Sequence, residues 1–155
     1  MDFYSADKKG AMEASVEGID LADFRSAHNG MYHTALREIK AGKKINHWIW
    51  YIFPQLKILG HSYMAQRYGI KGAQQAKAFY DDETLGKNLK EICEALLECE
   101  SDNAFEVMGP PDDLKLKSSM TLFYLATGDE LFKRVLEKFY SGQMDEITVS
   151  YLENE

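Results

Sequence analysis

The sequence predicts an all-α fold, an irregular multihelical globule in a single domain. Apolar residues recur at helical spacing along most of the chain, and glycines interrupt these patterns at short intervals. No internal repeat of solenoid period and no low-complexity linker divides the chain. At 155 residues it has the usual length of one domain and can bury a core without disulfides or metals.

The N-terminal part is expected to differ from the rest. Residues 1–18 are polar and without a clear period, so we predict a loose arm there and a single domain over residues 19–155. Asp20 can cap a first helix of that domain. The dipeptide Asn29-Gly30 predicts a turn after it.

A second helix is expected over residues 31–39, closed by Gly42. The next segment, residues 47–53, is the most hydrophobic of the chain, and periodicity alone does not separate a buried helix from a buried strand there. We favour a helix because its neighbours are helical and no partner strand is visible. Pro54 should bend or end it.

The remaining helices are predicted from local start signals. Asp and Asn side chains accept hydrogen bonds from the first turn of a helix, and proline suits its first position. In the last helix, either Ile147 or Thr148 is expected to face the core. The apolar patterns predict these helices over about residues 62–68, 73–80, 82–99, 103–108, 112–126, 129–142 and 145–152.

Charge and cysteine usage limit the partners. The net charge of −7 and the pI near 5.1 argue against nucleic-acid binding. No apolar run could span a bilayer, and the first residues lack the pattern of a signal peptide. Cys93 and Cys99 do not have the spacing of a zinc site, and unpaired cysteines fit a reducing compartment. We therefore expect a cytoplasmic protein without a metal site or a membrane partner.

The hydrophobic segment is also a candidate site. Trp48 and Trp50 could form a stacking wall for a ligand, with Gln55 beside them. His47 can transfer a proton near neutral pH, which makes it a catalytic candidate. The alternative is an aromatic core whose polar nitrogens find ordinary hydrogen bonds.

A second dense polar block covers residues 109–123. Lys115 is the expected contact for an anion, and Lys115 and Asp113 are further catalytic candidates. Asp113 and Lys117 lie four residues apart, the spacing of an ion pair on a helix. A salt bridge is the alternative explanation for these charges.

Hydroxyl side chains in the same block also have two interpretations. Ser118, Ser119 and Thr121 are poor residues for a helix interior unless they gain some interaction. One is contact with a ligand, so Ser118 and Ser119, like Lys117, are candidate ligand-binding residues. The other is a hydrogen bond to the carbonyl one turn earlier, where a second helix approaches closely.

Taken together, these residues resemble the domain-of-unknown-function family 1810, whose bacterial members have sometimes been labelled calpastatin. The resemblance runs from about Leu21 to Leu152 and implies an all-α, multihelical single domain with no established activity. Lys117 departs from it, because arginine is more common at that position. A compact aromatic-rich domain is unlike a disordered inhibitor, so we expect no calpain inhibition. The matching segments are residues 47–56, 59–62, 64–65, 68–70 and 111–123.

Two functions fit these patterns. The first is a small-molecule pocket, binding or catalytic, formed where the two blocks meet. A phosphorylated or nucleotide-like ligand would suit lysine and hydroxyl groups near a helix start, although Asp112 and Asp113 already occupy its positive end. The alternative is a non-catalytic protein–protein interaction module. The sequence leaves the cofactor unknown, and it lacks the signatures of nucleotide hydrolases, serine hydrolases and zinc proteases.

Overall fold

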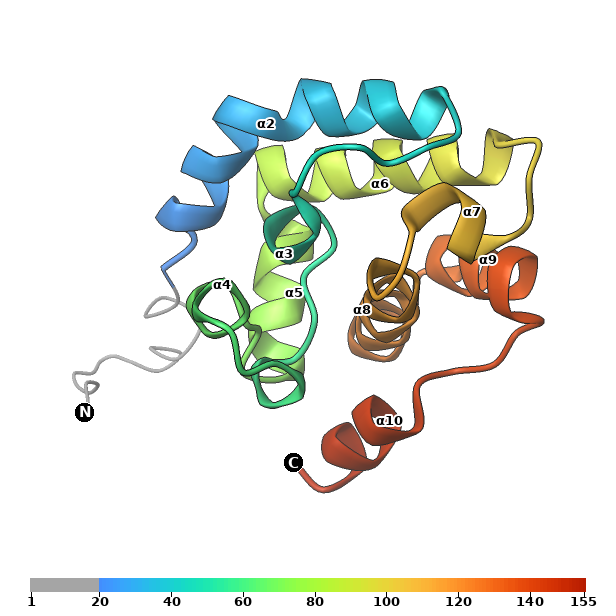
Figure 1. The fold of residues 1–155 in the computed structure, drawn as a ribbon. Helices are drawn as coiled ribbons and strands as arrows, with labels where there is room; N and C mark the ends of the chain where they lie inside the picture. Colours follow the sequence, from blue (N-terminus) through green and yellow to red (C-terminus); the bar gives the residue numbers. More distant parts are fainter. Residues whose placement is uncertain (1–19) are drawn as a thin grey trace.

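The computed structural model describes residues 20–155, and within them the chain forms α-helices and no strand, which confirms the all-α prediction (Figure 1). The predicted arm, residues 1–18, lies outside the described residues. One 3₁₀ turn, Lys57–Leu59, separates α3 from α4. The helices are α2 (Ala22–Lys40), α3 (Ile49–Ile52), α4 (Tyr63–Arg67), α5 (Ala73–Asp81), α6 (Glu83–Glu98), α7 (Ala104–Met108), α8 (Asp112–Thr127), α9 (Glu130–Tyr140) and α10 (Glu146–Glu153).

The turn predicted at Asn29-Gly30 is wrong, because both residues lie inside the continuous helix α2. A glycine in a helix interior costs about 1 kcal/mol relative to alanine. Burial along one face of α2 outweighs that local cost, and this face packs on α6, which lies beside α2 in Figure 1. The buried apolar and aromatic residues that continue across the expected break are Phe24, His28, Tyr32, Ala35 and Ile39.

Helix starts follow the predicted caps closely. The side chains of Asp82, Asn103, Asp129 and Asp145 each accept a hydrogen bond from a backbone N–H in the first turn of the helix that follows. At the other end, α2 and α8 are followed by glycines with positive φ, as expected for Gly42. These helix starts could be predicted because the capping side chain and the N–H that it bonds lie within three residues of each other.

The hydrophobic segment forms the short helix α3, so the expected helix is confirmed for residues 49–52. After Pro54 the chain runs through α4 and returns to itself. The Ile70 N–H donates to the Gln55 carbonyl at 2.9 Å, and the Lys57 N–H donates to the Ile70 carbonyl at 2.7 Å. Gln55 and the residue before Ile70, Gly69, are thereby held close together.

The hydrophobic core draws on α2, α3 and α5 to α9, and an aromatic cluster lies between α5, α8 and α9. The ring centroids of Phe79 and Phe123 are 5.5 Å apart, and those of Phe123 and Phe132 are 5.7 Å apart. On α10, Thr148 is buried and Ile147 is exposed, which resolves the alternative that the sequence left open. None of the described helices is long and apolar enough to cross a membrane.

Candidate functional site

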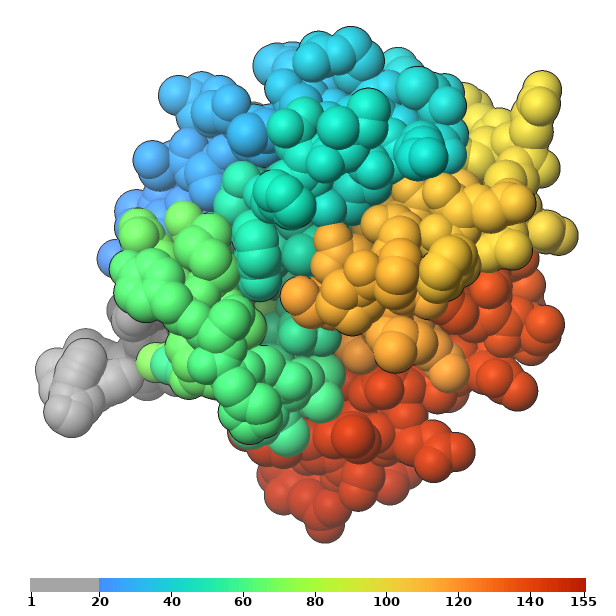
Figure 2. Space-filling model, in the orientation of Figure 1, coloured from blue at the N-terminus to red at the C-terminus, as the bar shows by residue number. Residues whose placement is uncertain are grey.

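The two polar blocks meet where α3 contacts α8. The Lys115 ammonium lies 5.6 Å from the centroid of the Trp50 ring, within the range of a cation–π interaction. On the face drawn in Figure 2, the segment of residues 47–60 borders the start of α8, shown in orange. Residues about 65 positions apart in the sequence therefore share one surface.

A narrow cleft opens at this contact, and we call it the Trp50–Lys115 cleft. The volume that water centres can reach is about 10 Å³, which is room for roughly one water molecule. Among the residues lining it, Lys115 alone is charged, and none carries a carboxylate. The lining residues are Ile49, Trp50, Phe53, Gln55, Ala65, Tyr68, Gly69 and Lys115.

Three side chains of this cleft have donors without a hydrogen-bond acceptor among the described residues. The Trp50 indole Nε1 is buried and has no partner. The Gln55 amide likewise makes no hydrogen bond to a described residue. The Lys115 Nζ has only a long contact of 3.6 Å to Asp112 Oδ1, which exceeds hydrogen-bond distance. An unpaired buried donor costs about 1 to 3 kcal/mol, a cost that applies here to the Trp50 N–H.

Asp112 forms ion pairs with both Lys115 and Lys44, and the pair with Lys44 is the tighter one. The Lys44 ammonium lies 2.7 Å from Asp112 Oδ2 and donates to the Asn46 carbonyl at 2.6 Å. Only 5% of the Lys44 side chain is exposed, compared with 27% for Lys115. Lys44 is therefore a fixed structural charge, whereas Lys115 keeps its donors and some freedom to move.

The wall at Gly69 depends on close backbone approach. A Cβ at this position would lie 2.5 Å from the Lys57 Cα and 2.7 Å from the Ala65 carbonyl oxygen. Any side chain would push the segment of residues 55–59 away from α4. Glycine thus allows this wall of the cleft to close.

Trp48 lies apart from the cleft, fully buried, and its indole N–H donates to Glu38 Oε1 at 2.9 Å. The Glu38 carboxylate also accepts hydrogen bonds from the Ile45 and Asn46 N–H groups and from the Asn46 amide. Burial raises the pKa of Glu38, but these hydrogen bonds together outweigh it and lower the pKa to about 2. This carboxylate organises the loop that leads into α3.

His47 is exposed and is not among the residues that line the Trp50–Lys115 cleft. Its carbonyl accepts a 3.5 Å hydrogen bond from the Tyr51 hydroxyl. The structure therefore brings Trp50, Gln55 and Lys115 together and leaves His47 outside that group. A role for His47 in proton transfer stays a prediction.

Hydroxyl groups of α8 serve the helix itself. Ser118 Oγ donates to the Leu114 carbonyl at 3.2 Å, and Thr121 Oγ1 donates to the Lys117 carbonyl at 2.8 Å. These are the bonds to the preceding turn that the sequence offered as an alternative. Ser119 is fully buried, and its hydroxyl has no partner among residues 20–155.

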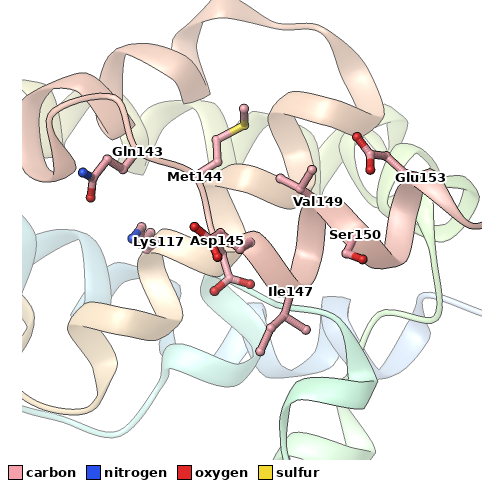
Figure 3. A pocket seen from close by; sticks show the side chains of 9 residues that line it. Lys117, Gln143, Met144, Asp145, Ile147, Val149, Ser150 and Glu153 are labelled. Atoms are coloured by element: carbon pink, nitrogen blue, oxygen red, sulfur yellow. The ribbon is translucent and has the colours of Figure 1, made fainter.

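The predicted ion pair between Asp113 and Lys117 is wrong for the described chain. Asp112 is the carboxylate of this helix that pairs with lysines, and the Asp113 carbonyl instead accepts a hydrogen bond from the Tyr140 hydroxyl. Lys117 lines a different, open hollow of about 790 Å³ beside α10. Figure 3 shows this hollow, with Lys117 on one side and residues of α10 such as Ile147 and Glu153 along the other.

No group of three or more His, Cys, Asp or Glu side chains in the described chain could hold a metal ion. Lys44, Phe53, Tyr68 and Gly69 were not singled out as site residues from the sequence. Tyr68 and Gly69 do belong to a segment that carries the family resemblance, and that was the available signal for them.

Comparisons with known proteins find a family and a solved structure that this chain resembles. A family model described as "Protein of unknown function (DUF1810)" matches residues 18–152, which confirms the resemblance. The crystal structure of the conserved hypothetical protein Rv1873 from Mycobacterium tuberculosis, at 1.38 Å, matches with 41% identity and a TM-score of 0.86. The match covers 88% of this chain and 98% of that chain. No curated protein matches the chain.

Proposed function

The chain belongs to the DUF1810 family of proteins of unknown function, so the family fixes no activity, and we propose from the cleft itself that the protein binds a small molecule with an anionic head group. The head group would enter the Trp50–Lys115 cleft. The observation that carries this proposal is that Trp50, Gln55 and Lys115, whose donors have no hydrogen-bond acceptor among the described residues, line one cleft in which no lining residue has a carboxylate. Phosphorylated and nucleotide-like molecules are among the candidates that the sequence suggested.

Charge supports an anionic ligand at this place. The chain as a whole carries a net charge of −7, and the larger hollow beside α10 is lined by Asp145, Glu146 and Glu153. The Trp50–Lys115 cleft has the opposite character, because its one charged group is an ammonium. Within a partly enclosed space of low dielectric, that charge attracts an anion more strongly than it would in water.

Binding is a better-supported proposal than catalysis. The lining residues provide donors and aromatic walls, and apart from Lys115 and Tyr68 they include no titratable side chain to act as a general base or nucleophile. Lys115, Trp50 and Gln55 would hold and orient the head group. Catalytic roles for His47 and Asp113 would need the ligand to reach beyond the cleft.

A thermal-shift screen tests the proposal. The wild-type protein, Lys115→Met and Lys133→Met would be screened against a set of carboxylates, phosphate esters and nucleotides. Lys133 is an exposed lysine on α9, so its variant controls for the loss of one charge. We expect at least one anion to raise the melting temperature of the wild type and of Lys133→Met but not of Lys115→Met. Equal protection of all three proteins, or protection of none, would contradict the proposal.

The alternative function is a non-catalytic interaction module. Two exposed apolar side chains near α10 favour it, since Ile58 is 50% exposed and Ile147 is 59% exposed, and both line one shallow hollow. In that case no small anion would protect the fold through Lys115. The same screen therefore separates the two functions.

A further inference from the structure

We infer that the head group bound in the Trp50–Lys115 cleft is a carboxylate with a single negative charge. This inference rests on the proposed function and narrows its ligand class. It selects carboxylates over the phosphorylated or nucleotide-like molecules that the sequence suggested. Three properties of the cleft support it, namely its charge, its donors and its size.

The charge of the cleft matches one negative charge. Lys115 is the one charged lining residue, and the nearby Lys44 is already paired with Asp112 at 2.7 Å. A carboxylate carries one negative charge at neutral pH, whereas a phosphate monoester carries about 1.5 to 2. A phosphate ester would therefore bring excess negative charge next to Asp112, whose Oδ1 lies 3.6 Å from the Lys115 ammonium.

The hydrogen-bond donors of the cleft also suit a carboxylate with two oxygens better than a phosphate ester with three. A carboxylate presents two acceptor oxygens, which the Lys115 ammonium, the Trp50 N–H and the Gln55 amide could share. Phosphate sites in proteins usually add an arginine fork or the free N–H groups of a helix start. No arginine lines the cleft, and Asp112 and Asp113 occupy the first turn of α8.

The size of the cleft also favours the smaller head group. The apolar residues Ile49, Phe53 and Ala65 line the cleft and are themselves buried. The space that water centres reach is only about 10 Å³, so it admits one oxygen-sized group as it stands. Lys115 is 27% exposed and makes no hydrogen bond to a described residue, so its side chain can move outward and admit the rest of the head group.

Isothermal titration calorimetry with matched probes tests this inference. Butyrate, hexanoate and phenylpropionate would each be compared with the primary amide and the phosphate monoester of the same tail. We expect a carboxylate to bind the wild type at least about tenfold more tightly than its amide and its phosphate ester. Binding should fall by about tenfold or more in Lys115→Met and in Trp50→Phe, but not in Lys133→Met. Trp50→Phe keeps an aromatic wall, so it remains informative should Lys115→Met unfold.

The outcomes separate this inference from the proposed function. Tighter binding of a phosphate ester, with the same dependence on Lys115, would overturn the carboxylate assignment and leave the anion-binding cleft standing. Equal binding of acid and amide would show that charge is not recognised. No binding by any probe would overturn the carboxylate assignment, and the thermal-shift screen with nucleotides would then decide on the proposed function. Binding that survives in both Lys115→Met and Trp50→Phe would overturn both.

Discussion

The indole N–H of Trp48 donates a 2.9 Å hydrogen bond to the buried carboxylate of Glu38, ten residues earlier in the chain. Trp50, two residues later, has a buried indole N–H without an acceptor in the described structure. Two tryptophans of one short segment therefore have different roles. Trp48 fixes the loop before α3, and Trp50 lines the cleft.

This difference predicts opposite tolerance to the same substitution. Trp48→Phe should lower the free energy of unfolding by about 2 kcal/mol or more, because it removes a buried donor from Glu38 and leaves a void. Trp50→Phe should cost less than about 1 kcal/mol, since no hydrogen bond is lost. Urea denaturation of both variants measures the two values. An equal loss of unfolding free energy in the two variants would contradict the separate roles of Trp48 and Trp50.

Glu38 should make stability depend on pH in the acid range. Its pKa is about 2 in the folded protein, compared with 4.5 as the ordinary value. The contribution is therefore complete above about pH 4.5 and is lost as the pH falls toward 2. The difference in unfolding free energy between the wild type and Glu38→Gln should shrink between about pH 5 and about pH 3. A constant difference across this range would show that the folded carboxyl titrates normally.

His28 should make stability depend on pH closer to neutrality. Burial lowers its pKa from 6.5, although its hydrogen bond to the Tyr51 carbonyl and the charge of Asp82 partly oppose the shift. Because the unfolded chain then binds a proton that the folded protein does not, stability should fall as the pH drops below about 6.5, by at most about 1.4 kcal/mol per pH unit.

The comparison that isolates this effect uses His28→Gln and, as a control, His61→Gln at an exposed position. Denaturation at about pH 7.5 and about pH 5.5 should give a smaller decrease for His28→Gln than for the wild type. His61→Gln should behave as the wild type does. A decrease of the same size in all three proteins would assign the pH dependence to other groups.

Two helix glycines should respond in opposite directions to alanine. Gly30 lies in α2, and a Cβ there would meet no atom within 4 Å. Gly30→Ala should therefore raise the free energy of unfolding by about 0.5 to 1 kcal/mol. Gly86 lies in α6, where a Cβ would come within 2.0 Å of the Tyr80 carbonyl oxygen, so Gly86→Ala should destabilise the fold. Thermal melts of both variants provide the check, and a loss of stability in Gly30→Ala would contradict it.

The helix boundaries could be predicted where their cause is local. Asp82, Asn103 and Asp145 each bond an N–H within three residues, so their roles are visible in a short stretch of sequence. The break expected at Asn29-Gly30 failed for the opposite reason. The continuity of α2 comes from packing against α6, more than 40 residues away, and no local pattern reports that contact.

The candidate site could be predicted only in part. Lys115 and Lys117 both belong to the polar block, but residues two apart on a helix face nearly opposite directions, so they line different hollows. The separation of Lys115 from Lys117 could have been predicted from helix geometry. The partnership between Trp48 and Glu38 was not, because the fold alone brings the buried carboxylate to one indole rather than to the other.

The most direct test of the cleft is the nuclear magnetic resonance signal of the indole N–H groups, of which the chain has two. The variant Trp50→Phe lacks the signal of Trp50, so a comparison of its spectrum with that of the wild type assigns both signals. On titration with phenylpropionate, the Trp50 signal should shift progressively and saturate, while the Trp48 signal, held by Glu38, should stay in place. A Trp50 signal that does not move, or one that moves no more than that of Trp48, would contradict binding in the Trp50–Lys115 cleft.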